Sequence, residues 1–307
     1  MNLFSKLQYK VKSRLNTYVT RQRAEKRKTA ILDYFKINKP EDAEFEAAVA
    51  YLKHHPLGVF PDAFTNKYNF RNIEVFKDQA KDLLWVNHGG HRLYFKRSYN
   101  ITTVKLLYNG LLAEQDVASP HRYTAKGFEL KAGDVLLDVG SAEGIFTLSN
   151  ITMLKKAVLF EREPEWVEAL EATFEPWKEK VQIVSKFVSD SNDAENICID
   201  TFLEGTNLVP DLVKIDVEGA EERVLKGMER LIAEYHPDIA LCTYHKQHDF
   251  SKFNTYFAQK DYVTGTTPGL MFFLSADETL QPPFFRKGLI RAKGKAAEKT
   301  DELPLDV

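Results

Sequence analysis

The second half of the chain alternates short apolar segments with amphipathic ones, and this pattern restricts the fold more than any other feature. The apolar segments are rich in Val, Ile and Leu, as strands buried on both faces are. They lie at residues 134–139, 157–161, 181–188, 211–216 and 238–244. Helical stretches lie between most of them, at residues 144–155, 165–178 and 219–234. Repeated strand–helix–strand units predict an α/β fold, in which helices cover both faces of a parallel sheet.

The pattern changes towards the end of the chain. Two apolar segments, 262–264 and 270–274, are separated by little more than a Pro268-Gly269 turn. A parallel crossover needs a dozen or more residues, so these segments predict a hairpin that adds one antiparallel strand. The expected sheet therefore has seven strands and is mostly parallel. Residues 286–307 contain Lys, Glu and Ala but few large apolar groups, which predicts a charged C-terminal tail.

The preceding part of the chain, residues 1–115, is expected to form a mainly helical N-terminal region. Helices are predicted over residues 1–36, 39–55 and 104–112. A hairpin is predicted where residues 83–87 and 92–95 flank His88-Gly89-Gly90-His91. Residues 116–285 would then form the catalytic domain.

Residues 1–28 carry nine basic residues and one acidic residue, although the whole chain has a formal net charge of -2. Leucine and other apolar residues recur about every four positions in this segment, which predicts a basic amphipathic helix. We interpret this helix as packing against its own domain or a partner protein. Peripheral contact with an anionic membrane surface through its basic face is the alternative.

The composition also restricts the location and the partners of the protein. The small net charge gives no global field that would favour nucleic acid. The sequence has neither an apolar signal core at its start nor a run of some 18 apolar residues that could span a membrane. Cys198 and Cys242 lie in apolar runs without metal-ligand spacing and are expected to be reduced thiols. We therefore expect a cytoplasmic protein.

A loop with two glycines follows the strand at 134–139, and it reads Asp138-Val139-Gly140-Ser141-Ala142-Glu143-Gly144. Open α/β sheets bind ligands at this end of their strands, and glycine lets the backbone approach a ligand closely. The next strand ends in Glu161, whose carboxylate can accept hydrogen bonds from both hydroxyls of a ribose. The spacing of the two glycines departs from the dinucleotide fingerprint, which disfavours NAD, and Asp138 suits an amino group. A plain turn between strand and helix is the simpler alternative.

The string Lys214-Ile215-Asp216-Val217-Glu218-Gly219-Ala220-Glu221 ends the fourth predicted strand. It resembles the hallmark of the FkbM-type methyltransferases, and residues 133–146, 158–161 and 221–227 resemble that family in order and spacing. The similarity covers about residues 115–275. It implies a Rossmann-like methyltransferase sheet and S-adenosylmethionine as the cofactor. The implied cofactor-binding residues lie at five places: Asp138, the loop from Gly140 through Ser141, Ala142 and Glu143 to Gly144, Glu161, the pair Ser189 and Asp190, and Asp216.

The sequence departs from the family pattern in two places. Glu161-Arg162-Glu163-Pro164 stands where the family often has Glu-Pro, and the fifth strand ends in Cys242-Thr243-Tyr244-His245 instead of a Glu-Ile-His-like string. The string from Tyr244 to Asp249 resembles a bacterial subgroup associated with polysaccharide biosynthesis. The resemblance thus implies an O-methyltransferase that acts on a sugar, glycan or glycolipid hydroxyl. A catalytically idle scaffold of the same fold is the alternative.

A sugar hydroxyl has a high pKa, so its methylation calls for a positioned base or a metal ion. The catalytic candidates stand at the ends of the fourth and fifth strands: Asp216, Glu218, His245 and Asp249. Asp216 could instead hold the cofactor amine, and Glu218 could compensate a helix dipole. Oxygen ligands from Asp216, Glu218 and Asp249 would suit Mg²⁺, but we expect no metal. Residues 116–123, which precede the first strand, suit a lid or a sugar platform, and an ordinary turn is the alternative.

Overall fold

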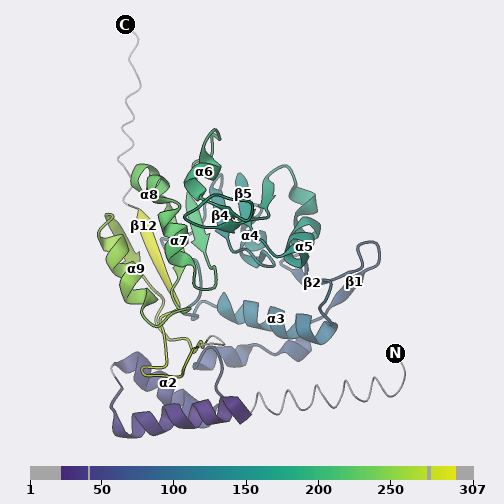
Figure 1. Cartoon of the computed structure of the whole chain (residues 1–307). Helices are drawn as coiled ribbons and strands as arrows, with labels where there is room; N and C mark the ends of the chain where they lie inside the picture. The colour runs from purple at the N-terminus through teal and green to yellow at the C-terminus, as the bar shows by residue number, and fades with distance from the viewer. Residues whose placement is uncertain (1–21, 41, 275–277, 295–307) are drawn as a thin grey trace.

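A seven-stranded sheet forms the centre of the computed structural model, which describes residues 22–40, 42–274 and 278–294. The strand order is β11-β12-β10-β9-β4-β5-β6 (Figure 1). Strands β10, β9, β4, β5 and β6 run parallel, whereas β12 is antiparallel to both of its neighbours. The bounds are β4 Val135–Val139, β5 Lys156–Phe160, β6 Val181–Val184, β9 Leu212–Ile215, β10 Asp238–Cys242, β11 Tyr262–Gly265 and β12 Leu289–Gly294. The predicted fold class is confirmed.

The position of the antiparallel strand was predicted wrongly. Residues 270–274 form only an isolated bridge between Met271 and Arg286, and the strand between β10 and β11 is β12. Leu289, Ile290 and Ala292 of β12 are buried in the sheet. The strand was not predicted because this segment contains basic residues. One of them, Arg291, is buried and donates to the Arg122 carbonyl and the Thr267 hydroxyl. Residues 289–294 of the predicted tail are thus part of the sheet, and residues 295–307 lie outside the described residues.

Helices cover both faces of the sheet because alternate strand residues point to opposite sides. On one face, Leu136 and Leu159 pack with α3, α4, α5 and the hairpin β2–β3. On the other, Leu137 and Val158 pack with α6, α7, α8 and α9. The helix bounds are α3 Ile101–Glu114, α4 Ile145–Asn150, α5 Pro164–Phe174, α6 Ile199–Leu203, α7 Glu221–Lys226, α8 Glu229–Tyr235 and α9 Asp249–Ala258. Two hydrophobic cores therefore hold the sheet, and the predicted N-terminal region supplies part of one of them.

The predicted strand at 181–188 and the predicted helix at 219–234 are each divided into two shorter elements. Strand β6 ends at Val184, and residues 187–188 form β7, which pairs with β8 Asn196–Ile197. The predicted helix over 219–234 divides into α7 and α8 at Gly227. A Cβ atom at Gly227 would lie 2.0 Å from the Ser189 carbonyl oxygen. The close approach of these two backbones means that only glycine fits at this position. The short helix η3 Glu175–Trp177 follows α5.

The N-terminal helices pack below α3 and the sheet (Figure 1). Residues 22–37 are helical, and α2 Ala43–His54 begins at the cap Asp42, whose carboxylate accepts the N–H groups of Glu44 and Phe45. Both helices bury their apolar faces against residues 270–274 and 280–285. The remaining elements are η1 Ala63–Lys67, η2 Phe70–Asn72, β1 Phe76–Asp78, β2 Leu83–His88 and β3 His91–Tyr94. The predicted hairpin is confirmed, with β1 as an additional strand.

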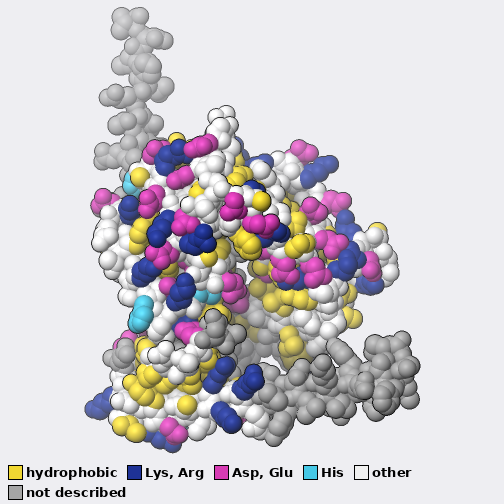
Figure 2. All heavy atoms as spheres, in the orientation of Figure 1, with side chains coloured by type: hydrophobic (Ala, Val, Ile, Leu, Met, Phe, Trp, Pro, Cys, Tyr) yellow, Lys and Arg dark blue, Asp and Glu magenta, His cyan; other side chains and the backbone are white. Residues whose placement is uncertain are grey.

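Acidic and basic side chains are interspersed over the visible face of the upper part of the molecule, and hydrophobic side chains gather over the N-terminal helices (Figure 2). An apolar hollow of about 440 Å³ lies there between the first two helices, lined in part by Leu32, Phe35 and Val49. Most of the predicted basic helix, residues 1–21, lies outside the described residues. In the part of the chain that is described, no helix is long and apolar enough to cross a membrane.

Candidate active site

The candidate site lies where the carboxyl ends of β4, β9 and β10 meet. The glycine loop follows β4, Asp216 follows β9, and His245 lies three residues beyond the end of β10. His121 and Tyr123 reach the same place from the segment before β4. Sequence reasoning had placed a lid or sugar platform in that segment. A larger hollow of about 740 Å³ is lined in part by Lys77 and Asn100. It opens at the N-terminal end of α3, away from these strand ends.

The glycine loop is held tightly against the neighbouring strands. Gly140 has φ +74°, and a Cβ atom there would lie 2.0 Å from the Asp216 carbonyl oxygen. The N–H groups of Gly140 and Ser141 donate to the Phe160 carbonyl at 3.0 and 3.2 Å. Ala142 has φ +46°, a conformation that is strained for a side-chain-bearing residue and typical of functional loops. The backbone thus forms a close cradle that only glycine permits at position 140.

Glu161 supports this loop from the end of β5. Its Oε2 atom accepts the Ala142 N–H at 3.0 Å, and its Oε1 atom accepts the Glu163 N–H at 2.8 Å. A carboxylate has about four lone-pair sites, so both oxygens can still accept bonds from hydroxyls. The predicted ribose carboxylate therefore lies beside the predicted cofactor loop.

Lys214 is a central residue of the site that sequence reasoning missed. Its buried ammonium lies 3.1 Å from Asp138 Oδ1 and donates to the Gly140 carbonyl at 2.6 Å. Burial alone would lower the pKa of Lys214, but the Asp138 and Asp216 carboxylates raise it above its ordinary value. Asp138 also accepts the Thr147 hydroxyl at 2.6 Å. Asp138 therefore anchors the loop through Lys214. The Lys214 ammonium already occupies the carboxylate that was predicted to bind a cofactor amine.

Asp216 is a fixed carboxylate surrounded by donors. Its Oδ2 accepts the Tyr123 hydroxyl at 2.9 Å, and its Oδ1 accepts the Tyr244 hydroxyl at 3.2 Å. Burial alone would raise the pKa of Asp216, but His121 and Lys214 lower it well below its usual range. So strong an acid is a poor proton acceptor near pH 7. Of the two roles predicted for Asp216, the geometry favours holding or orienting positive charge.

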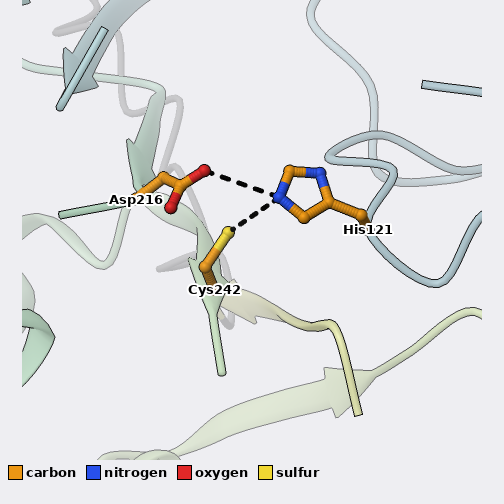
Figure 3. A group of neighbouring side chains, drawn as sticks. All are labelled: His121, Asp216 and Cys242. Carbon is orange, nitrogen blue, oxygen red and sulfur yellow. Dashed lines mark hydrogen bonds and ion pairs between the residues drawn. The ribbon is translucent and has the colours of Figure 1, made fainter. Parts of the chain in front are cut away.

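One ring nitrogen of His121 faces both Asp216 and Cys242 (Figure 3). Its Nε2 atom is 3.5 Å from Asp216 Oδ2 and 3.6 Å from Cys242 Sγ. Two sets of donor atoms in the described residues lie within 4.8 Å of one another: His121, Asp216 and Cys242, and Asp216, Glu221 and His245. Asp216 belongs to both sets and already accepts two tyrosine hydroxyls. The expectation that no metal binds here stays a prediction.

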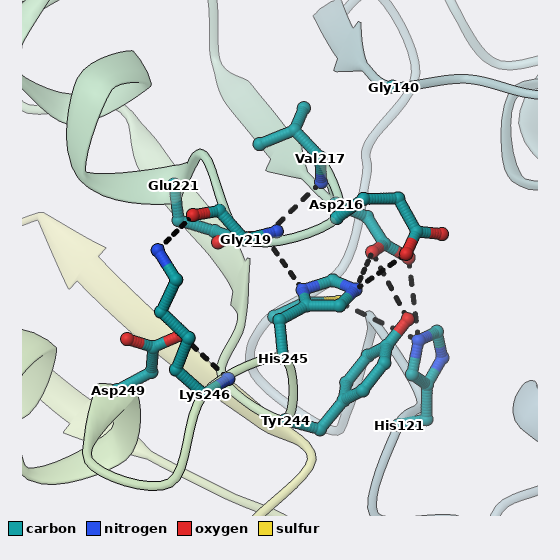
Figure 4. Close-up of polar contacts among 12 residues, drawn as sticks. His121, Gly140, Asp216, Val217, Gly219, Glu221, Tyr244, His245, Lys246 and Asp249 are labelled. Carbon is teal, nitrogen blue, oxygen red and sulfur yellow. Dashed lines mark hydrogen bonds and ion pairs between the residues drawn. The ribbon is translucent and has the colours of Figure 1, made fainter. Parts of the chain in front are cut away.

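The His245 imidazole is the candidate base. Its side chain is 2% exposed, and its Nδ1 atom lies 2.8 Å from Glu221 Oε1. Its Nε2 atom lies 3.6 Å from Asp216 Oδ1 and 3.7 Å from Glu218 Oε2, and neither ring nitrogen has an aligned hydrogen bond (Figure 4). The Glu218 side chain is 83% exposed. The structure therefore brings together three of the four predicted catalytic side chains: Asp216, Glu218 and His245.

The fourth predicted catalytic residue, Asp249, lies behind this group. Its Oδ2 atom accepts the Lys246 N–H at 3.1 Å (Figure 4), and burial raises its pKa. This geometry suits a carboxylate that shapes the loop after β10. Of the predicted cofactor-binding pair Ser189 and Asp190, Asp190 already pairs with Arg223 at 2.9 Å, and this partner lowers its pKa. These assignments stay predictions.

Buried polar atoms without hydrogen bonds concentrate at this site. In the described residues there are eight such side-chain atoms, and only Tyr256 and Tyr262 contribute atoms from elsewhere. The others belong to His121, Asp138, Ser141, Glu221 and His245; of these, Asp138 Oδ1 and His245 Nδ1 have ion-pair contacts, with Lys214 at 3.1 Å and Glu221 at 2.8 Å. Buried polar groups normally have partners, so the cluster fits a ligand with several hydrogen-bonding groups. Burial also raises the pKa of Glu143 to about 8, so this side chain is mostly neutral near pH 7, and a bound cationic group would favour its ionised form.

The sheet order, the glycine cradle and the carboxylate at the end of β5 define a methyltransferase-type α/β domain. Residues 153–265 match the family model described as the methyltransferase FkbM domain. This region of the chain is therefore similar to the FkbM methyltransferase domain, in agreement with the resemblance that its sequence shows. The matched range begins after the glycine loop, so the loop is independent support for this class.

Solved structures show distant similarity. An FkbM methyltransferase from Methylobacillus flagellatus KT is 16% identical with a TM-score of 0.43, and the match covers 64% of this chain and 56% of that one. Precorrin-6y C5,15-methyltransferase from Geobacter metallireducens GS-15 is 12% identical, with a TM-score of 0.37 and coverage of 54% and 82%. TrmK from M. capricolum, in complex with S-adenosylhomocysteine, is 13% identical, with a TM-score of 0.36 and coverage of 54% and 64%. No curated protein matches the chain. The chain thus spans little more than half of the first of these structures.

We expect Glu161→Ala to weaken the binding of S-adenosylhomocysteine by about 1.5–3 kcal/mol, the value of hydrogen bonds to a charged group. The variant would lose both the ribose acceptor and the tether to the Ala142 N–H. Isothermal titration calorimetry measures the change, and Glu163→Ala, on the same loop, is the control. Unchanged affinity in Glu161→Ala would remove this carboxylate from the cofactor site.

Proposed function

We propose that the protein is an S-adenosylmethionine-dependent O-methyltransferase that acts on a hydroxyl group of a sugar, glycan or glycolipid. The observation that carries this proposal is the free Nε2 atom of His245, which is buried beside the glycine cradle and faces Asp216. A neutral imidazole can accept a hydroxyl proton near pH 7. The site therefore combines a place for the methyl donor with a base for the acceptor.

The residues present fit the proposed cofactor. The bound cofactor supplies a methyl group on a sulfonium, whose leaving group needs no proton. The loop of residues 140–144 would hold the methionine part, and Glu161 would accept the ribose hydroxyls. Asp216, kept ionised by its neighbours, would attract the positive charge. The orphaned polar atoms of Ser141 and His121 offer further hydrogen bonds.

Aromatic side chains around His245 support a sugar acceptor. Phe273 lies edge-on to both Tyr244 and His245, with ring centroids 5.2 and 5.4 Å apart. Tyr123 and His121 lie on the other side of Asp216. Aromatic faces bind the apolar C–H faces of sugar rings, while carboxylates such as Glu218 accept sugar hydroxyls. The chain would need to align such an acceptor and exclude water from it.

We expect His245→Ala to lower the rate of methyl transfer by about 100-fold or more, because general-base catalysis contributes at least that much. The assay follows S-adenosylhomocysteine formation with a panel of nucleotide sugars, oligosaccharides and lipid-linked sugars. Asp216→Asn, which removes the charge that orients the site, should lose a similar factor. His248→Ala changes an exposed histidine three residues away and should keep the wild-type rate.

Two outcomes contradict the proposal in different ways. Wild-type rates in both site variants would eliminate His245 and Asp216 as the catalytic pair. Tight cofactor binding without turnover on any acceptor of the panel would instead favour an idle scaffold of this fold.

A further inference from the structure

We propose that Glu221 is a positioning residue that holds the His245 ring with Nδ1 protonated and Nε2 free to accept the proton of the acceptor hydroxyl. This inference rests on the proposed function and adds a residue that the FkbM-like string contains but that our sequence reasoning left without a role. Glu221 and His245 would act as a buried carboxylate–imidazole pair, in which the carboxylate never contacts the acceptor.

The Glu221 carboxylate is held by backbone groups from its own turn. Its side chain is 0% exposed. Its Oε1 atom accepts the Val217 N–H at 3.3 Å and the Gly219 N–H at 3.2 Å (Figure 4). Glu218 and Gly219 have φ +54° and +97°, the left-handed conformations that fold this turn around the carboxylate. A buried carboxylate fixed in this way can impose an orientation on a partner.

His245 Nδ1 is the atom next to this carboxylate, at an ion-pair distance of 2.8 Å from Glu221 Oε1 but without an aligned hydrogen bond. A carboxylate only accepts hydrogen bonds, so it favours the ring form that carries the proton on Nδ1. The lone pair of Nε2 then points to the opposite side, towards Asp216 Oδ1 and Glu218 Oε2. The backbone of the same loop is also fixed, because Arg286 donates to the Tyr244 and His245 carbonyls at 2.8 Å each.

The charges around His245 support proton uptake at Nε2. Four carboxylates face the ring from different elements: Asp216 after β9, Glu218 in the turn, Glu221 on α7 and Asp249 on α9. Burial alone would lower the pKa of His245, but Glu221 and then Asp216 raise it above its ordinary value. A base with a raised pKa is a stronger proton acceptor, provided that it is still neutral at the working pH.

In the proposed methyl transfer, one bond forms, one bond breaks and one proton moves. The acceptor oxygen forms the new bond to the methyl carbon, and the carbon–sulfur bond breaks with its electron pair remaining on sulfur. The hydroxyl proton moves to His245 Nε2, and the Nδ1 proton stays between His245 and Glu221. The imidazolium is stabilised by the adjacent carboxylates until it returns the proton to solvent.

The first test reads the ring itself and needs no acceptor. We expect ¹⁵N NMR of the wild-type imidazole at high pH to show His245 protonated on Nδ1 and unprotonated on Nε2. In Glu221→Gln, the amide group can donate to Nδ1, so a large share of the ring should change to the Nε2-protonated form. Glu222→Gln makes the same change on the next residue, which is exposed and pairs with Lys252, and should leave the ring unchanged.

The second test uses kinetics. Glu221→Gln should lower kcat by about 100-fold with little change in KM. The acidic limb of its kcat/KM profile should move to lower pH, because the carboxylate that raises the pKa of His245 is gone. Glu221→Asp restores the charge and should recover part of the rate. Glu222→Gln should keep both the rate and the pH profile.

An Nε2-protonated ring in the wild type would overturn the inference whether or not the variants fold. Full kcat in a folded Glu221→Gln variant with an unchanged pH profile would also overturn it. If the wild type shows the expected ring form but transfers no methyl group to any acceptor, the proposed function fails while the ring orientation stands.

Discussion

Replacing Lys214 with methionine is expected to lower the free energy of unfolding by about 3–5 kcal/mol, the usual cost of leaving one partner of a buried ion pair alone. Lys214 is 4% exposed and links Asp138 to the Gly140 carbonyl. Methionine keeps most of the side-chain volume, so the loss would come from the Asp138 charge and the freed carbonyl. Chemical denaturation monitored by circular dichroism measures this change.

Two variants make the Lys214 experiment specific. Lys226→Met removes an exposed i,i+4 pair with Glu222 and should cost less than about 1 kcal/mol. Adding Asp138→Asn to Lys214→Met neutralises the stranded charge and should restore part of the stability. If Lys214→Met proves no more harmful than Lys226→Met, the buried pair does not hold the loop in place.

Gly140→Ala is expected to abolish tight binding of S-adenosylhomocysteine, with a loss of affinity of about 100-fold or more if two loop hydrogen bonds are displaced. A Cβ atom 2.0 Å from the Asp216 carbonyl oxygen must push the loop away from β9. That movement would strain the N–H contacts of Gly140 and Ser141 with the Phe160 carbonyl. Calorimetry and the ligand-induced rise in melting temperature both report the loss.

Gly127→Ala separates the steric clash from the backbone conformation. Gly127 has φ +83°, close to that of Gly140, but nothing lies within 4 Å of the position where its Cβ atom would be. It should therefore cost only about 1–2 kcal/mol of stability, the penalty of a left-handed L-residue, and leave cofactor affinity unchanged. Equal affinities in the two variants would show that the close approach to Asp216 is not needed for binding.

The glycine loop, Glu161, Asp216 and His245 could be predicted because each lies directly after a legible strand. The rule that strands of an open α/β sheet end at the binding site then brings them together. Lys214 and Glu221 belong to the same string, yet their partners are distant in sequence. Asp138 lies 76 residues before Lys214 by number, and only the alignment of β4 with β9 shows that the two side chains meet. The sequence did contain one sign of this ion pair: Lys214 stands in a buried strand, and a buried charge needs a partner of opposite charge.

The misplaced seventh strand has a similar cause. Residues 270–274 are more apolar than 289–294, and local pattern favours the more apolar segment. Leu270 and Phe272 instead pack against the N-terminal helices, a contact with residues more than 200 positions earlier. Arg291 could enter the sheet because a carbonyl and a hydroxyl compensate its burial. The packing of residues 270–274 and the burial of Arg291 both depend on residues that are distant in sequence, so a local sequence pattern cannot show them.

Strand β12 affects the order in which the sheet can form during synthesis of the chain. It inserts between β10 and β11, and the residues before it hold the loop of His245: Thr243 bonds to the Gly288 and Lys287 carbonyls, and Arg286 binds the two carbonyls that follow. A ribosome delivers these residues after all the others of the sheet. Until they emerge, one edge of β10 is unpaired and the loop of His245 lacks these hydrogen bonds. A nascent chain could therefore form the cofactor cradle early, but it would gain the ability to transfer a methyl group only when the sheet closes.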